Sequence, residues 1–290
     1  MLEVTLEEAN LQGANLQEAH LKVANLQKAN LQGANLQHAY FRGARLQQAN
    51  FQEANLETAV FQEADLRGAN FKKAHLKQTI FIGADLTDIT ESQEVIVTNF
   101  EEANLEKADL SCAKLKRANL QKANLHKANL KAADLEAADL RFSNLREADL
   151  LDANLRVAFL REANFFRADL HRADLQVAYL YRANLKSAKL VGANLQRADL
   201  QKSNLKLANL TSANLQYADL YRADLEAANL KEADLRNAHL EGANLYRANL
   251  EATNLKDANL DIADLSQIKN FTEEQIQEAQ NWQRARRDVS

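Results

Sequence analysis

The sequence lacks proline altogether and contains one cysteine and seven glycines among its 290 residues. Because Cys112 has no second thiol, the chain forms neither an intrachain disulfide framework nor a metal site of several thiolates, which fits a reducing compartment. No apolar run approaches the roughly 20 residues that a membrane-spanning helix needs, and the opening segment, MLEVTLEEAN, lacks the basic and apolar parts of a signal peptide. These absences predict a soluble, cytoplasmic protein that does not associate with membranes.

An excess of charge of one sign is also missing. There are 36 basic and 40 acidic side chains, and the small acidic excess lies in residues 1–99, which hold 12 acidic and 8 basic groups. Residues 100–290 carry 28 of each. Because nonspecific binding to nucleic acid needs an extended basic field, this balance argues against nucleic acid as a partner.

What the sequence has in abundance is a five-residue repeat. Leu or Phe recurs every five residues from Leu6 to Leu86 and again from Phe100 to Leu265, which makes 51 repeat centres. Ala stands two residues before 45 of these centres, and the exceptions are Val4, Thr79, Thr98, Ser143, Ser203 and Thr253. This regularity is typical of a repeat architecture.

The period of five fits neither an α-helix nor a continuous strand. Within one unit, Ala and the centre are two positions apart, so a short extended segment points both side chains inward and the intervening Asn or Asp outward. A turn at the next two residues then keeps every centre inside. All glycines occupy the second of these corner positions, where a positive φ is favoured, namely Gly13, Gly33, Gly43, Gly68, Gly83, Gly192 and Gly242.

Units such as ANLQG, ADLEA and ANLYR resemble the A(D/N)Lxx pattern of the pentapeptide-repeat family, and the resemblance covers almost all of residues 4–265. It implies an all-β fold, a right-handed quadrilateral β-helix with four repeats per coil and the Leu, Phe and Ala side chains in a narrow core. Coils stacked at about 4.8 Å predict a rod of roughly 60 Å. The ending TEEQIQEAQNW is similar to the tails of cyanobacterial members of the family.

The pattern predicts a first repeat block, an interruption, a second block continuous with the first, and a capping helix with its tail, at residues 1–86, 87–99, 100–265 and 266–290. The spacing from Leu86 to Phe100 is one position short of the three repeats that would keep the register. We interpret this as one lost residue, with a single irregular corner near Glu91 to Glu94, a coil one residue shorter than the others, and a β-branched strand at residues 95–98 that rejoins the stack. The alternative is a kink or protruding loop that divides the rod and marks a partner site.

Beyond Leu265 the pattern becomes that of a helix, which we expect over residues 270–283 as a cap on the final coil. The residues predicted to form this cap are Phe271, Thr272, Gln275, Ile276, Ala279 and Trp282. The Thr and Gln match a capping box, Phe and the following Ile match a hydrophobic staple, and the apolar residues follow a helical spacing. No such cap precedes Val4, so the first coil is expected to present a bare edge for self-association or a partner, unless flanking sequence covers it.

Corner residues at the same place in successive coils put basic and aromatic side chains in one column. The candidate partner-binding residues are Arg141, Arg161, Tyr181, Arg182, Lys202, Tyr221 and Arg222. Residues four repeats apart in sequence become neighbours about 4.8 Å apart in adjacent coils, and basic groups beside exposed aromatic rings are typical of protein hot spots and nucleic-acid platforms. The alternative is that these long side chains only decorate a solvated corner.

No residues suited to catalysis, metal binding or cofactor binding stand out. The histidines all occupy outward positions, and no two are neighbours in one column of adjacent coils: His20, His38, His75, His126, His171 and His239. Cys112 and His126, the one conceivable thiol dyad, fall on different corners, and no Gly-rich phosphate loop is present. We therefore expect neither enzyme activity nor a cofactor.

The sequence thus favours a non-enzymatic scaffold or regulator that presents a rigid surface for protein–protein interaction, with a partner that the sequence does not identify. The alternative, implied by the quinolone-resistance branch of the family, is a DNA-mimicking inhibitor or protector of a type II topoisomerase. Mimicry of DNA needs a strongly acidic rod, whereas residues 100–290 are neutral.

Overall fold

The computed structural model describes residues 4–288. The chain forms two compact units, Met1–Asp149 and Leu150–Ser290, which we call unit 1 and unit 2. The boundary between them falls inside the second of the two predicted repeat blocks.

Each unit is a stack of coils joined by parallel backbone pairing. The outward residue of each repeat pairs with the equivalent residue four repeats further on, for example Asn10 with Asn30 in unit 1 and Asn194 with Asn214 in unit 2. The N–H of each repeat centre donates to the next coil, as Leu11 does to Asn30 at 2.7 Å. Because a turn follows every repeat centre, each coil of four repeats has four sides, which agrees with the predicted four-sided coil. The right-handed sense of the coil remains a prediction.

The core of each unit is made of the repeat centres and the alanines that precede them. Centres from Leu26 to Leu260 are at most 1% exposed, and each buried Leu contributes about 1.5–3 kcal/mol relative to exposure. Where Thr replaces Ala, its hydroxyl is satisfied inside the core, since Thr79 Oγ1 donates to the backbone oxygen of Leu56 at 2.8 Å. In the first coil, by contrast, Leu6 and Leu11 are only half-buried, because no described coil packs on their other side.

The corners are β-turns closed by a hydrogen bond from Ala to the preceding centre, such as Ala14 N to Leu11 O at 3.1 Å. The second corner residue has a positive φ even when it is not glycine, with 59° at both Glu18 and Val177. This is the geometry of a type II turn. Placing β-branched residues in this region is costly, so the corner conformation is imposed by the coil rather than by local preference.

The outward Asn and Asp residues have two structural tasks. Their Oδ1 accepts the corner N–H two residues later, as Asp219 does from Tyr221 at 3.0 Å. The side-chain amide of an Asn donates to the outward residue of the preceding coil, as Asn70 Nδ2 does to Asn50 Oδ1 at 3.0 Å. The preference for Asn or Asp therefore follows from satisfying corner N–H groups that no neighbouring coil reaches.

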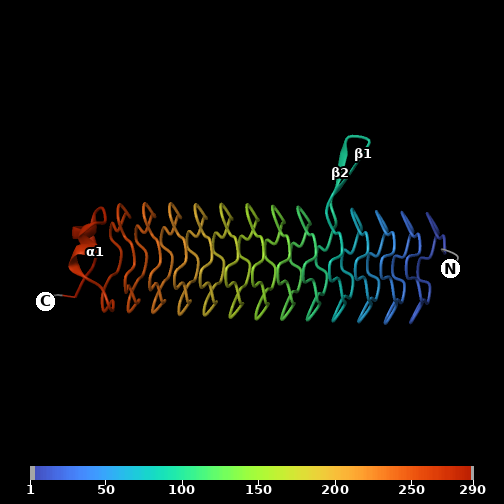
Figure 1. The fold of residues 1–290 in the computed structure, drawn as a ribbon, viewed down its shortest axis with the longest axis horizontal. Helices are drawn as coiled ribbons and strands as arrows, with labels where there is room; N and C mark the ends of the chain where they lie inside the picture. Colours follow the sequence, from blue (N-terminus) through green and yellow to red (C-terminus); the bar gives the residue numbers. More distant parts are fainter. Residues whose placement is uncertain (1–3, 289–290) are drawn as a thin grey trace. The chain divides into compact units, whose positions relative to one another are not determined.

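The interruption is an antiparallel hairpin that leaves unit 1 (Figure 1), formed by β1 (Ile89–Glu91) and β2 (Glu94–Ile96). The single irregular corner and the shortened coil are therefore wrong. Asn70 pairs with Asn99, nine positions beyond the usual partner, so nine residues have been inserted and the stack resumes in register. The β-branched residues pair across the hairpin rather than with the coils, because Ser92 and Gln93 have positive φ values of 51° and 71° and make the tight turn that a hairpin needs.

At the end of unit 2, helix α1 spans only Glu273–Gln277, and a short 3-10 turn spans Trp282–Arg284, so the expected helix over 270–283 is too long. The reason is competition from the final coil, whose edge N–H groups need acceptors. Leu260 N donates to Gln280 O at 2.9 Å, and Leu265 N donates to Arg286 O at 2.8 Å. The tail therefore pairs with this edge at two isolated positions, Gln280 and Arg286, and α1 lies at the same end of the unit (Figure 1).

Candidate functional site

The differences between one coil and another lie in the outward side chains. Within residues 4–288, no group of three or more His, Cys, Asp and Glu side chains is arranged to hold a metal ion. In the same range, no helix is long and apolar enough to cross a membrane. The column of basic and aromatic corner residues is the first candidate surface.

On unit 2, three cations surround the ring of Tyr181. The guanidinium carbons of Arg161 and Arg182 lie 5.7 and 5.3 Å from the ring centroid. Lys202 Nζ lies 5.6 Å from the same centroid and donates to the Tyr181 hydroxyl at 3.4 Å. These distances are within the range of cation–π attraction, so the corner residues of three successive coils form one cluster.

The other predicted residues are placed differently. Tyr221 and Arg222 form their own pair, with the guanidinium carbon 5.1 Å from the ring centroid, one coil beyond Lys202. Arg141 lies in unit 1, where Asp139 holds its Nε and Nη2 at 2.9 and 2.6 Å. This hydrogen bond raises the pKa of Arg141. The charge of Arg141 is therefore paired with its own neighbour, and its place in a partner-binding surface remains a prediction.

Two exposed aromatic residues were missed by sequence reasoning. Phe159 and Tyr179 stack with ring centroids 5.3 Å apart and planes 6° apart, and each is 43% exposed. They stand two residues before Arg161 and Tyr181, at the position usually taken by Asn or Asp, and neither ring offers the oxygen that accepts the corner N–H elsewhere. The signal was present in the sequence as an aromatic residue in place of the structural Asn or Asp, a local cost typical of functional positions.

We call Phe159, Arg161, Tyr179, Tyr181, Arg182 and Lys202 the aromatic–basic patch. Among the residues that the structure describes, Arg182 and Lys202 form no ion pair, and Arg161 pairs with Glu162 at 3.3 Å. The cations of the patch are thus held by aromatic faces more than by carboxylates, which leaves their charge available to a partner.

Carboxylates border the patch on the following coils. Asp199 and Asp219 are paired residues of adjacent coils, and Gln201 Nε2 donates to Asp219 Oδ2 at 2.7 Å. Burial raises the pKa of Asp199, and the charge of Asp219 raises it further, although the Gln201 N–H opposes both effects. The edge of the patch is therefore a place where negative charge is already crowded.

Unit 1 carries a smaller strip of non-Asn side chains at the same repeat position. His20 stacks on Tyr40 with centroids 5.1 Å apart, and Lys22 Nζ lies 5.7 Å from the Tyr40 centroid. The next residues of this column are Val60 and Ile80, both half-buried. The strip has one cation over an aromatic ring, whereas the patch on unit 2 has three.

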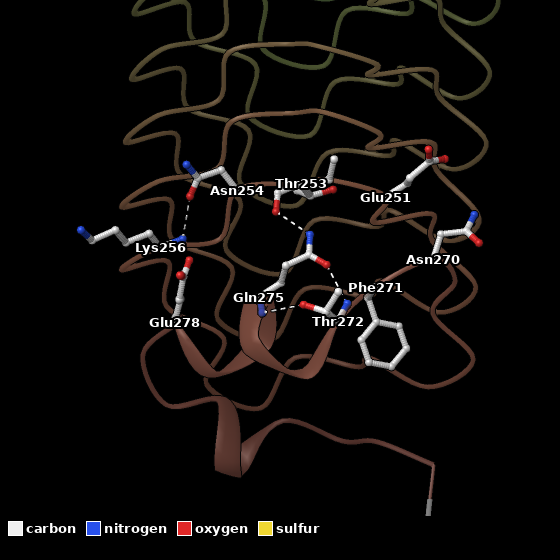
Figure 2. Close-up of a pocket in the computed structure, with 10 residues that line it drawn as sticks. Glu251, Thr253, Asn254, Lys256, Asn270, Phe271, Thr272, Gln275 and Glu278 are labelled. Atoms are coloured by element: carbon white, nitrogen blue, oxygen red, sulfur yellow. Dashed lines mark hydrogen bonds between the residues drawn. The ribbon is translucent and has the colours of Figure 1, made fainter.

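Three of the predicted cap residues, Phe271, Thr272 and Gln275, border an open hollow of about 770 Å³ between the final coil and α1. Figure 2 shows Gln275 between Thr253 and Thr272. Its Nε2 donates to the backbone oxygens of Thr253 and Leu250 at 2.9 and 3.2 Å, and its Oε1 accepts from Thr272 N at 2.7 Å. Thr272 Oγ1 in turn accepts from Gln275 N, which completes the capping box.

The remaining cap residues pack beneath this box. Ile276 and Ala279 are buried, while Phe271 and Trp282 are half-buried with the Arg287 guanidinium carbon 6.0 Å from each ring centroid. The hollow is thus bordered by groups that satisfy the end of the coil. A role of the cap in keeping the molecule from associating remains a prediction.

Models of pentapeptide repeats match residues 3–71 and, as eight further copies, segments that together cover 59–89, 98–226 and 228–267. The chain belongs to the pentapeptide-repeat family. The gap between 89 and 98 coincides with the hairpin, so the pentapeptide pattern is lost where the coil is interrupted. No curated protein sequence matches the chain.

Several solved structures of pentapeptide-repeat proteins are similar to this one. HetL, involved in heterocyst differentiation regulation in the cyanobacterium Nostoc sp. strain PCC 7120, is 31% identical over 88% of each chain, with a TM-score of 0.30. A protein from the thylakoid lumen of Arabidopsis thaliana is 33% identical over 37% of this chain and 71% of its own, with a TM-score of 0.28. QnrB1, a plasmid-mediated fluoroquinolone resistance protein, is 16% identical over 77% of this chain and 91% of its own, with a TM-score of 0.44.

Proposed function

We propose that this pentapeptide-repeat protein is a non-enzymatic scaffold or regulator that binds a protein partner through the aromatic–basic patch of unit 2. The observation that carries the proposal is the ring of Tyr181 with Arg161, Arg182 and Lys202 around it. Tyr and Arg are the residue types enriched at protein hot spots. Coil pairing holds their backbones in place, so little conformational entropy is lost when a partner binds.

The partner surface that fits this patch carries carboxylates beside apolar groups. Arg182 and Lys202 form no ion pair among the described residues, and an incoming carboxylate gains charge-assisted hydrogen bonds from them. The stacked rings of Phe159 and Tyr179 add an exposed apolar area directly beside these charges. Such a combination suits an acidic, partly hydrophobic protein segment, and the equal numbers of acidic and basic residues in unit 2 provide no overall basic field for a nucleic acid.

The structure adds no support to the DNA-mimic alternative. Unit 2 carries 19 acidic and 19 basic residues, and its most distinctive surface is basic. Mimicry needs a continuous negative surface to reproduce the phosphate charge of DNA. A supercoiling assay with a type II topoisomerase is expected to show no inhibition by the purified protein.

The proposal is tested by capturing partners from the native organism with the full chain and with Tyr181→Ala/Arg182→Ala. We expect the variant to lose captured partner at least about tenfold, because each hot-spot truncation costs about 1–2 kcal/mol. The matched control is Tyr246→Ala/Arg247→Ala, which removes another corner pair of unit 2 whose guanidinium carbon lies 4.9 Å from the ring centroid. Equal retention of every partner by both folded variants would contradict the proposal.

A further inference from the structure

The hairpin of unit 1 rests on one corner glycine. It leaves the coil at the corner that follows Gly68 in the stack, and a Cβ at Gly68 would lie 2.8 Å from Ile89 Cγ2 and 3.2 Å from Ile96 Cγ2. At Gly33, which has a similar positive φ, a Cβ would meet nothing within 4 Å. Glycine at position 68 therefore makes room for the two isoleucines at the base of the hairpin.

The base is also fixed by polar contacts. Thr98 Oγ1 accepts from Gly68 N at 3.0 Å and lies 3.1 Å from the Thr87 backbone oxygen, to which it can donate. Arg117 and Asp88 form an ion pair at 3.0 Å beside it. The hairpin is thus held in one orientation against the earlier coils of unit 1.

At the other end of β1, the Glu91 carboxylate reaches two of those earlier coils. Its Oε1 accepts from Lys28 Nζ at 2.8 Å, and its Oε2 accepts from Gln48 Nε2 at 2.7 Å. These hydrogen bonds lower the pKa of Glu91, with the bond from Lys28 as the largest cause. Both carboxylate oxygens are therefore bound by groups of the coil surface.

Beside this contact, the hairpin and the coils enclose a cleft of about 400 Å³. The cationic residues that line it are Lys28, Arg45 and Arg67. Arg67 is held by Asp65, with its Nε and Nη2 at 2.9 and 2.7 Å from the two carboxylate oxygens. Arg45 forms no ion pair with any residue in the described range, although the side-chain oxygen of Gln27 accepts from its Nε at 2.8 Å. The cleft thus has one cation bound to Glu91 of the hairpin and another that lacks a carboxylate partner.

The cleft also contains an unsatisfied hydrogen-bond acceptor. Gln47 lines it, and its Nε2 donates to Asp65 Oδ2 at 2.6 Å. Its Oε1 is buried and accepts no hydrogen bond from the part of the chain that the structure describes. A buried acceptor without a donor is costly, and because this oxygen is buried, it does not itself contact a ligand in the cleft.

We propose that this cleft binds an acidic peptide segment of a partner protein, and that Glu91 of the hairpin occupies the carboxylate position when the segment is absent. A peptide supplies carboxylates for Lys28 and Arg45, as Glu91 of the extended strand β1 does for Lys28. We favour a peptide over nucleic acid because the group that Lys28 binds in this structure is a peptide carboxylate. The site is independent of the patch on unit 2.

The test is a fluorescence anisotropy titration of a labelled hexaglutamate peptide with the full-length protein. Glu91→Gln removes the resident carboxylate from Lys28, so we expect it to bind the peptide about fivefold more tightly than the unmodified protein, the effect of a surface ion pair. Adding Arg45→Ala to this variant is expected to abolish the gain.

Glu94→Gln is the matched control, since it removes the same charge from β2, and Glu94 forms no ion pair among residues 4–288. An equal gain in Glu91→Gln and Glu94→Gln would reduce the effect to net charge and overturn the proposal. Absence of binding by Glu91→Gln would overturn it too. Displacement of the peptide by unlabelled oligothymidylate would contradict the proposal of a peptide ligand and would indicate that the cleft binds phosphate groups.

Discussion

Units 1 and 2 use the same coil of four repeats, but most aromatic rings of unit 1 lie in the core, whereas most of those of unit 2 lie on the surface. In unit 1, six phenylalanines stand at repeat centres and are fully buried: Phe41, Phe51, Phe61, Phe71, Phe81 and Phe100. In unit 2, Phe165 is the one buried core phenylalanine, while five of the six tyrosines of the chain point outward. The comparison shows that a coil of this kind assigns rings to packing or to recognition without changing its backbone.

The buried rings of unit 1 form two interlocked stacks. Rings at the same place in adjacent coils lie nearly parallel, such as Phe41 and Phe61 with centroids 4.7 Å apart, and rings of the two stacks meet edge to face, such as Phe51 and Phe61 at 5.7 Å. Both are favourable geometries that contribute about 0.5–1.5 kcal/mol per pair beyond area burial. Of the five outward tyrosines of unit 2, four contact cations, namely Tyr181, Tyr217, Tyr221 and Tyr246, which suits these rings to binding rather than to stability.

The strongest test of the shared coil is a charge at a repeat centre of the Leu-rich unit. Leu155→Lys places an ammonium where the side chain is 0% exposed, so we expect it to lower the free energy of unfolding by more than about 4 kcal/mol. Lys186→Ala, an outward corner change, is the control. Thermal unfolding followed by circular dichroism measures both, and similar melting temperatures would contradict the inward assignment.

A second test removes the cap that distinguishes the end of unit 2. Truncation after Ser266 leaves Leu260 N and Leu265 N without their acceptors and exposes a pairing edge. We expect the truncated protein to associate, as measured by light scattering after size exclusion. Gln275→Ala, which keeps the pairing of Gln280 and Arg286 with the coil edge, should remain monomeric. A monomeric truncated protein would show that the cap does not control association.

The ring stacks of unit 1 are tested by replacing a phenylalanine at a repeat centre with leucine, the residue that occupies most repeat centres of unit 2. Phe61→Leu removes ring contacts to four neighbours, two stacked and two edge to face, and we expect a loss of about 1–3 kcal/mol in urea unfolding. Phe165→Leu makes the same change at a core position without a ring neighbour among the described residues. It should cost less, and equal losses would mean that the stacks add nothing beyond volume.

The smallest expected effect concerns the acidic border of the patch on unit 2. Because burial and Asp219 raise the pKa of Asp199, its proton is held more strongly in the folded state. The stability this provides is present below the unfolded pKa of about 3.9 and is lost as pH rises through the folded pKa.

Asp199→Asn should therefore increase the free energy of unfolding at pH 7 by no more than about 0.5 kcal/mol and raise the melting temperature accordingly. This gain should vanish near pH 3. Thermal scans at both pH values measure this difference. Asp257→Asn, a change of an exposed corner carboxylate, controls for net charge. A gain that persists at pH 3 would exclude the ionisation of Asp199 as the cause.

The sequence predicts the features that repeat. The centres, alanines and corner glycines follow from a strict period of five, and the capping box of Thr272 and Gln275 is local enough to be read directly. The column around Tyr181 was found because coil stacking converts a separation of four repeats into contact. The pairing of Arg141 with Asp139 was not predicted, because it depends on side-chain geometry that periodicity does not describe.

The features that the sequence does not predict arise from single departures from the repeat. The nine-residue insertion was mistaken for a one-residue loss, because the spacing from Leu86 to Phe100 is one short of three repeats and also equals one repeat plus nine. The contact of Glu91 with Lys28 joins residues that are distant in sequence and depends on the direction in which the hairpin leaves the coil. The helix at 273–277 ends early because the tail is recruited to the coil edge, a tertiary effect that a helical spacing does not reveal.

The space that Gly68 leaves for Ile89 and Ile96 also indicates how such a coil accommodates an inserted segment. An insertion that begins and ends at one corner leaves the pairing of Asn70 with Asn99 intact, and its bulk is tolerated because the corner below it lacks a side chain. We expect other glycine corners, such as Gly33, to accept a grafted hairpin at the corner that follows them in the stack. Each corner glycine of the coil thus marks a site where one insertion can add a protruding hairpin without disturbing the stacked coils.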